Sequence, residues 1–213
     1  MKKEKSNIVW YNNANIITAL MIGLISLIII LSQSFAVNKN LDAVTILRDI
    51  INHNFNYIMV LLYFIALKLP FGKKYFNYLN IFLVVLYLVF TITSFLSIFQ
   101  SITISSLVSL GIKVVLLVYL IHTMFKDTRY FNDFRINKSP FNDITNDGYY
   151  SCILVLTSIL LAFNLIMVTS IDGAIITILD SMYYLLLARY VYLYRDYLEF
   201  KTMKQLKEKE EEK

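Results

Sequence analysis

The sequence contains few residues that break helices, cross-link chains or carry charge. It has two prolines, five glycines and one cysteine, Cys152, in 213 residues. A single cysteine excludes an intrachain disulfide. Transporters with broken helices usually carry Gly or Pro at mid-membrane depth, and tightly packed membrane helices use small residues four apart. Neither pattern is evident here, which disfavours a transporter built in that way.

Recognisable catalytic and ligand-binding motifs are also missing from the sequence. It contains no HExxH, GxSxG, GxGxxG or Walker pattern. No group of His, Cys and acidic residues has the spacing of metal ligands, so we expect neither a metal site nor a cofactor. These absences disfavour the common enzyme classes and direct attention to the apolar runs.

Long apolar runs bounded by charge dominate the chain. Hydrophobic residues make up 58% of it and charged residues only 16%, against about half and a quarter in soluble domains. Since a membrane crossing needs about 20 apolar residues, we expect an all-α polytopic membrane protein, a bundle of six transmembrane helices. The expected spans are about 16–37, 55–69, 76–98, 104–125, 150–171 and 174–195, within one domain over 1–198, before a charged cytosolic tail at 199–213.

Two connections in this layout carry particular predictions. Between the first two spans, Leu41, Val44, Leu47 and Ile51 recur at helical spacing, which predicts a short surface helix or a watery extension of the second span. The second span is the shortest, and a re-entrant segment is its alternative. Asp172-Gly173 predicts a tight turn into the last span.

The distribution of basic residues predicts the orientation. With a cytosolic N-terminus, 17 of the 20 Lys and Arg lie on the cytosolic side, as the positive-inside rule requires. Lys39 and Arg48 fall outside, and Lys113 falls within the membrane. We therefore expect both termini in the cytosol, the lipid bilayer of the plasma membrane as the surroundings, and no nucleic-acid partner, because the net charge of +5 follows topology rather than one soluble face.

The stretch Ala174–Leu198 predicts one helix that crosses the membrane and continues into the cytosol. From Asp180, a stripe at helical spacing runs down one face, with Arg189 and Arg195 off it. The stripe consists of Asp180, Tyr183, Tyr184, Leu187, Tyr190, Tyr194 and Tyr197. Tyr183, Tyr184, Tyr190 and Tyr194 either line a polar groove or pack between helices with bonded hydroxyls, and packing is the favoured interpretation.

Lys113 and Asp180 are the charged residues expected inside the membrane. Burying a charge there costs about 3 kcal/mol, so such residues face the protein and pair. Their depths differ by about 6 Å along parallel spans, within the reach of a lysine. We predict an intramembrane ion pair, either a helix register device or a step in a proton or ion pathway, with the structural role favoured.

Two functions from different classes follow. The favoured one is a non-enzymatic membrane subunit: a small permease or channel component, or an accessory protein that acts with a membrane or cytosolic partner. The alternative is a membrane thiol peptidase or acyltransferase, in which His122 activates the Cys152 thiolate near the cytosolic surface. That alternative requires the two side chains to lie within hydrogen-bond reach.

Overall fold

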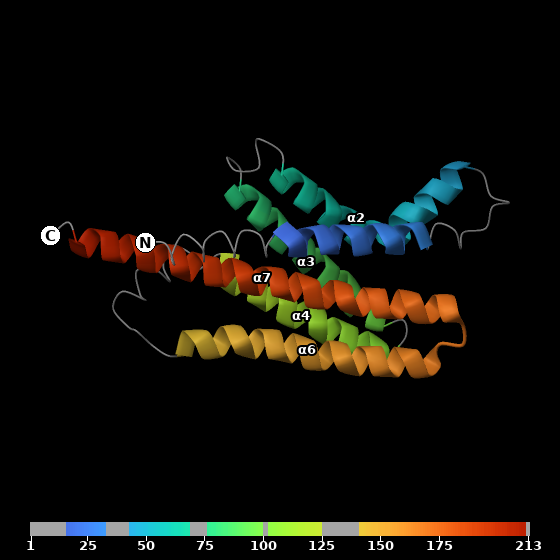
Figure 1. Ribbon diagram of the computed structural model, residues 1–213. Coiled ribbons are helices and arrows are strands. Elements are labelled where there is room, and N and C mark those ends of the chain that lie inside the picture. Colours follow the sequence, from blue (N-terminus) through green and yellow to red (C-terminus); the bar gives the residue numbers. More distant parts are fainter. Residues whose placement is uncertain (1–15, 33–42, 69–75, 100–101, 125–140, 212–213) are drawn as a thin grey trace.

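The fold is helical wherever the structure describes it. The computed structural model describes residues 16–32, 43–68, 76–99, 102–124 and 141–211 (Figure 1). Within these ranges the secondary structure is helix and short connections, without a strand. The helices are Ile16–Ser32, α2 (Ala43–Lys68), α3 (Phe76–Ile98), α4 (Ile104–Met124), α6 (Phe141–Met167) and α7 (Ile171–Glu211).

Four of these helices contain stretches long and apolar enough to cross a membrane. The stretches are Tyr78–Ile98, Ile104–Thr123, Asp147–Met167 and Ile171–Tyr194. Each has 20 to 24 residues, or about 30–36 Å of helix, which matches the hydrocarbon core. The apolar stretches Ile16–Ser32 and Asn54–Leu67 are shorter. The expected all-helical fold is confirmed for the described residues, with four helices that could cross a membrane; the six-span count and the orientation of the termini stay predictions.

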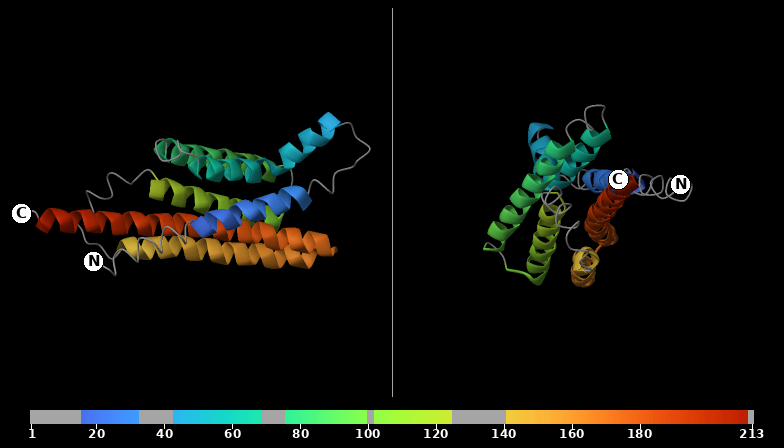
Figure 2. Two further views of the ribbon diagram at one scale, coloured as in Figure 1. Left: turned by 45° about the horizontal axis from the view of Figure 1, so that its top comes forward. Right: turned by 90° about the vertical axis from the view of Figure 1, so that its left-hand side faces the viewer.

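Successive helices run in opposite directions. In Figure 1 the helix Ile16–Ser32 and then α2, α3, α4, α6 and α7 alternate in direction along the bundle. Close backbone packing joins α3 to α4, α4 to α6 and α6 to α7, and α2 lies on α3. Helix Ile16–Ser32 approaches α2, since a Cβ at Gly23 would lie 3.4 Å from Leu61 Cδ1. The end-on view in Figure 2 shows the same succession.

Helix α2 joins two segments that the sequence separates. It is continuous from Ala43 to Lys68, so the amphipathic stretch is an extension of the second apolar run rather than a separate helix. Figure 1 shows a change of direction between its cyan beginning and its teal remainder. Near the middle, Asn54 Nδ2 donates to the Ile50 carbonyl at 3.0 Å. A side chain bonded into the helical ladder in this way is a physical cause of bending.

The connection between α6 and α7 differs from the predicted turn. Helix α6 ends at Met167 and α7 begins at Ile171, so Asp172-Gly173 belongs to the first helical turn. The hydroxyl of Ser170 caps this turn by accepting from the Gly173 N–H at 3.2 Å. A Cβ at Gly173 would lie 3.0 Å from Val168 Cγ1. The glycine therefore serves a close approach, and the turn prediction from Asp-Gly is wrong.

The start of α4 confirms the predicted division of the longest apolar run. Helix α3 ends at Ile98 and α4 begins at Ile104. Thr103 and Ser106 cap α4 reciprocally: Ser106 N–H donates to Thr103 Oγ1 at 3.1 Å, and Thr103 N–H donates to Ser106 Oγ at 3.0 Å. Two otherwise unpaired donors are satisfied by this capping box, so α4 begins here although the turn carries no charge.

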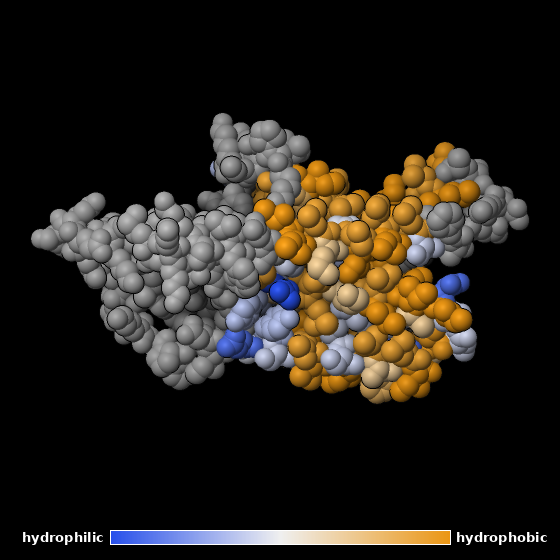
Figure 3. Space-filling model, in the orientation of Figure 1, coloured by the Kyte–Doolittle hydropathy of each residue, from blue (hydrophilic) through white to orange (hydrophobic). Residues whose placement is uncertain are grey.

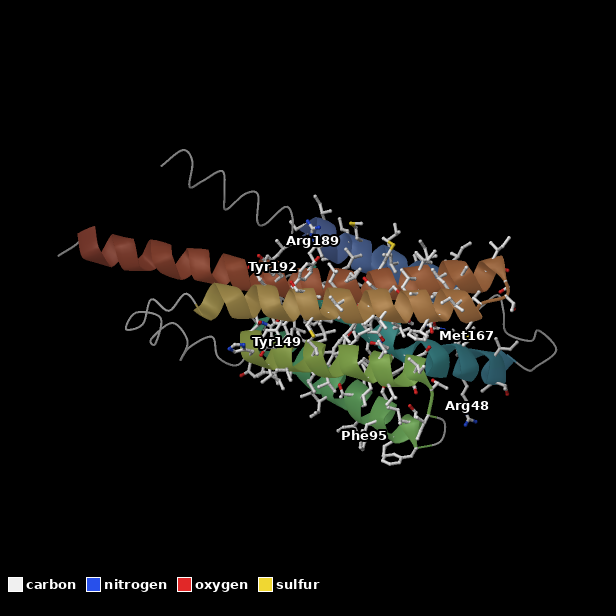
Figure 4. All side chains as sticks on the ribbon, turned by 90° about the horizontal axis from the view of Figure 1, so that it is seen from below. Arg48, Phe95, Tyr149, Met167, Arg189 and Tyr192 are labelled. Carbon is white, nitrogen blue, oxygen red and sulfur yellow. The ribbon has the colours of Figure 1, made fainter. Side chains whose placement is uncertain are left out.

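The outer surface of the bundle is apolar. Figure 3 shows a broad hydrophobic band over the described residues, with hydrophilic atoms toward both ends. On α7 an exposed stripe of Ile171, Ile175, Ile178 and Met182 is followed by exposed Arg189. In Figure 4, Arg189, Tyr149 and Tyr192 lie toward one end of the bundle, and Arg48 and Met167 lie toward the other. This distribution is that of side chains facing lipid and its two interfaces.

Helix α7 extends well past the other helices. Its 41 residues span about 60 Å at 1.5 Å per residue, roughly twice the hydrocarbon thickness. Figure 1 shows its red end beyond the rest of the bundle. The prediction that the last membrane helix continues past the apolar region is confirmed, and the helix reaches Glu211.

Candidate functional site: an interior polar cluster

One face of α7 forms the centre of the site. Tyr183, Tyr184, Tyr190 and Tyr194 are each at most 6% exposed, and Leu187 is fully buried. Arg189 is exposed on another face. These side chains share one buried face of α7 as far as Tyr194, while the side chains of Arg195 and Tyr197 lie outside the described residues. The tyrosines are packed between helices, which is the favoured of the two interpretations.

Asp180 lies at the head of this stripe and is held by α2. The Tyr57 hydroxyl of α2 donates to Asp180 Oδ1. The Tyr57 ring also lies edge-on to Tyr183, with ring centroids 5.0 Å apart at 75°. The carboxylate therefore has a charge-assisted hydrogen bond in the interior, a stronger contact than a bond between neutral groups.

Tyr183 extends the polar contacts to α3. Its hydroxyl donates to Asn56 Oδ1 of α2 at 3.4 Å, and it lies 3.2 Å from the Tyr87 hydroxyl of α3. Since the one proton of Tyr183 is directed to Asn56, Tyr87 is the donor to Tyr183. We call Asp180, Tyr57, Asn56, Tyr183 and Tyr87 the Asp180 cluster. It joins α7, α2 and α3 through hydroxyl, amide and carboxylate groups.

A second set of hydroxyls lies about two helical turns further along α7. The Tyr63 hydroxyl of α2 donates to Asn80 Oδ1 of α3 at 2.9 Å and lies 3.4 Å from the Tyr190 hydroxyl of α7. Tyr63 therefore donates to Asn80 and accepts from Tyr190. The Tyr190 ring meets Phe64 edge-on at 5.0 Å. We call Tyr63, Asn80 and Tyr190 the Tyr190 cluster; it joins the same helices a second time.

The side chain of Lys113 connects α4 to α3. Its Nζ donates to Ser94 Oγ at 2.6 Å. Lys113 and Asp180 attract each other electrostatically, yet among the described residues no salt bridge joins them and each charge has a hydroxyl partner. Their direct pairing stays a prediction. Depth along two parallel helices sets the level of a side chain but leaves open which neighbour it faces.

Cys152 and His122 make different contacts in the described part of the chain. Cys152 is exposed on α6. The His122 ring lies edge-on to Tyr149, with centroids 5.8 Å apart, and Tyr149 stacks on Tyr119 at 5.1 Å. No hydrogen bond links the thiol to the imidazole in these ranges. The histidine is part of an aromatic group at one end of the bundle, near the hydrogen bond from Tyr192 to Asp147 Oδ1 at 3.0 Å.

Several residues of the two clusters were not identified from the sequence, although their spacing in the sequence indicates an interior face. On α3, Asn80, Tyr87 and Ser94 follow each other at intervals of seven, and this places them on one face. Tyr183 and Tyr190 on α7 have the same interval. Polar residues that recur every seventh position in an apolar run mark an interior face, and this pattern identifies α3 as a partner of α7.

Comparisons with known proteins add no assignment to this geometry. No protein-family model, curated protein or solved structure matches the chain. Among the described residues no group of three or more His, Cys, Asp and Glu is placed to hold a metal ion.

Proposed function

We propose that the chain is a six-span, non-enzymatic subunit of the plasma membrane, with both termini in the cytosol. It acts as a small permease or channel component, or as an accessory protein bound to a membrane or cytosolic partner. The observation that carries the proposal is the interior polar cluster: a carboxylate, an ammonium group and several tyrosine hydroxyls lie between the helices, while the exposed surface is apolar. Intramembrane ionisable groups that face the protein interior are typical of such subunits.

The alternating directions of the six helices support the topology part of the proposal. The helix Ile16–Ser32 and α7 begin at opposite ends of the bundle (Figure 1), as the first and sixth helices of an up-down chain do. The positions of Lys and Arg give the same orientation. The shorter apolar stretch of α2 is completed by its amphipathic extension, because one continuous helix covers both.

Labelling of single cysteines tests the topology. In a Cys152→Ala background, cysteines introduced at Asn13 and Thr202 are expected to resist a membrane-impermeant thiol reagent added to intact cells. The same two positions should react after the cells are opened, which serves as the control. Labelling of either position in intact cells would contradict the six-span arrangement with both termini inside.

The surroundings of Cys152 do not support the thiol-enzyme alternative. The thiol is exposed on α6 and has no hydrogen bond to His122 in the described part of the chain. The Cys152→Ala variant should therefore keep full function in whichever assay its partner provides. Purification from native membranes in mild detergent supplies that assay, since a partner that stays bound identifies the process. Loss of function in Cys152→Ala would favour the thiol enzyme.

A further inference from the structure

The bond between Tyr57 and Asp180 differs from the other links between α2 and α7. In the described part of the chain, side-chain hydrogen bonds join these two helices from Tyr57 to Asp180, from Tyr183 to Asn56, and from Tyr190 to Tyr63. The latter two join neutral groups at 3.4 Å, the long end of a hydrogen bond. Only the first involves a charged group, and hydrogen bonds to charged acceptors are about twice as strong as neutral ones.

The strength of that bond depends on the charge of the Asp180 carboxylate. A carboxylate removed from water is costly unless it is paired, and protonation removes the cost. In the described part of the chain Asp180 has no cation within salt-bridge distance, because Lys113 is bonded to Ser94 on α3. Proton binding converts the carboxylate into a neutral acid. The acid accepts from Tyr57 more weakly, and its attraction to Lys113 is lost.

The titratable groups of the described residues that face Asp180 are tyrosines and a lysine, and none of them is a second carboxyl group. They are Tyr57 from α2, Tyr87 from α3, Lys113 from α4, and Tyr183 and Tyr184 from α7 itself. The helix Ile16–Ser32 carries no titratable side chain. The acids of α6, Asp143 and Asp147, belong to its first two turns, at the end where the aromatic group lies. Asp180 is therefore the carboxyl group that a described hydrogen bond places on the α2–α7 contact.

A polar group on α2 offers a place for the water that delivers the proton. Asn54 is fully buried, and its Oδ1 has no hydrogen-bond partner in the described structure. It precedes Tyr57 by three residues, so both lie on one face of α2. Buried polar atoms without a protein partner are the positions at which interior water binds.

We propose that Asp180 is a proton-binding site, and that its protonation weakens the hydrogen bond from Tyr57 and thereby loosens α2 from α7. The ligand is a proton from the aqueous phase: hydronium transfers it to Asp180 Oδ1 or Oδ2 and leaves water behind. No oxidant, reductant or metal takes part. The proposal does not depend on whether the protein is a permease component or an accessory subunit.

Infrared difference spectroscopy tests the proton-binding step on the purified full chain in lipid nanodiscs. A drop in pH should produce the C=O stretching band of a protonated carboxyl group. The band should disappear in Asp180→Asn, shift in Asp180→Glu and remain in Asp172→Asn, whose carboxylate is exposed in the first turn of α7. In Tyr57→Phe the band should change its frequency, since the carboxyl group loses its hydrogen-bond donor, whereas Tyr150→Phe should leave it unchanged. An unaltered spectrum in both Asp180 variants would overturn the proposal.

Distance measurements between spin labels test the coupling to α2. In a Cys152→Ser background, labels at Leu62→Cys on α2 and Met182→Cys on α7 occupy exposed positions, 51% and 39% exposed. Their distance distribution should broaden or lengthen at low pH, and Tyr57→Phe should show the broadened form at every pH. A control pair at Ile121→Cys on α4 and Met182→Cys should not respond to pH. A Leu62–Met182 distribution that is the same at both pH values would overturn the coupling, even if Asp180 binds a proton.

Discussion

The two sides of α7 are held together by different physical means. On one side, α7, α6, α4 and α3 pack with close backbones. On the other side, α2 reaches α7 through the hydroxyl groups of large tyrosines. Close helix packing dominates the first side, with hydrogen bonds such as Ser105 to Asn164 added to it, whereas side-chain hydrogen bonds and ring contacts of tyrosines join α2 to α7 on the second.

This difference shows where the bundle is adjustable. Lipid is as apolar as a leucine side chain, so membrane helices associate through close packing and hydrogen bonds. Close packing is lost only when backbones separate. A hydrogen bond between side-chain tips can weaken while the backbones stay where they are, and a bond to a carboxylate can be changed by a proton. Any movement within this protein is therefore expected between α2 and α7 before it is expected between α4 and α6.

The largest expected effect comes from removing the interior charges. Asp180→Leu leaves the Tyr57 hydroxyl without its acceptor and Lys113 without the nearby negative charge, and breaking such a buried arrangement costs about 3–5 kcal/mol. The double variant Lys113→Met, Asp180→Leu should recover part of this loss, because no unpaired charge remains. Thermal unfolding in detergent, followed by helical circular dichroism, measures both variants and Lys113→Met. Strictly additive losses of stability would mean that the two charges do not interact. The contact between α2 and α7 would then depend on hydrogen bonds of hydroxyl groups alone.

An intermediate effect is expected from glycine substitutions on the closely packed side. Gly173→Ala places a Cβ 3.0 Å from Val168 Cγ1 and Ser170 Oγ at the start of α7. The α6–α7 connection must shift, at a cost of about 1–3 kcal/mol. Gly111→Ala is the matched control, since its Cβ makes an ordinary contact at 3.8 Å and should be neutral or slightly stabilising. Equal stability of the two variants in the same unfolding assay would show that close packing does not limit this side of the bundle.

The smallest effect is expected from Tyr63→Phe on the tyrosine-linked side. The change removes the hydroxyl that donates to Asn80 and accepts from Tyr190 while it keeps the ring contacts. Leaving these buried partners unsatisfied should cost about 1–3 kcal/mol, toward the lower end because one of the two bonds is long. Tyr150→Phe, at the end of the bundle, serves as the control and should be close to neutral. A loss of stability in Tyr150→Phe as large as in Tyr63→Phe would mean that the buried hydroxyl of Tyr63 stabilises the fold no more than a hydroxyl at the end of the bundle.

The sequence alone determined the helices and their surroundings. Apolar runs of about 20 residues admit only one regular structure in lipid, since every backbone group must be bonded within its own segment. The expected spans at about 76–98 and 104–125 followed from this requirement together with the polar residues between them, and the helices run from Phe76 to Ile98 and from Ile104 to Met124. Helical spacing also predicted the buried face of α7, because the interval of 3.6 residues fixes which side chains share a face.

Only the tertiary structure decided which partners these side chains have. Spacing and depth placed Asp180 and Lys113 at similar levels, but the position of α2 beside α7 brings Tyr57 to the carboxylate, and the packing of α3 against α4 brings Ser94 to the ammonium group. Likewise, Asp172-Gly173 has the composition of a turn, yet the close approach of Val168 and the cap from Ser170 place both residues inside α7. Periodicity describes one helix at a time, whereas a hydrogen bond between helices depends on their relative rotation, which packing of the whole bundle sets.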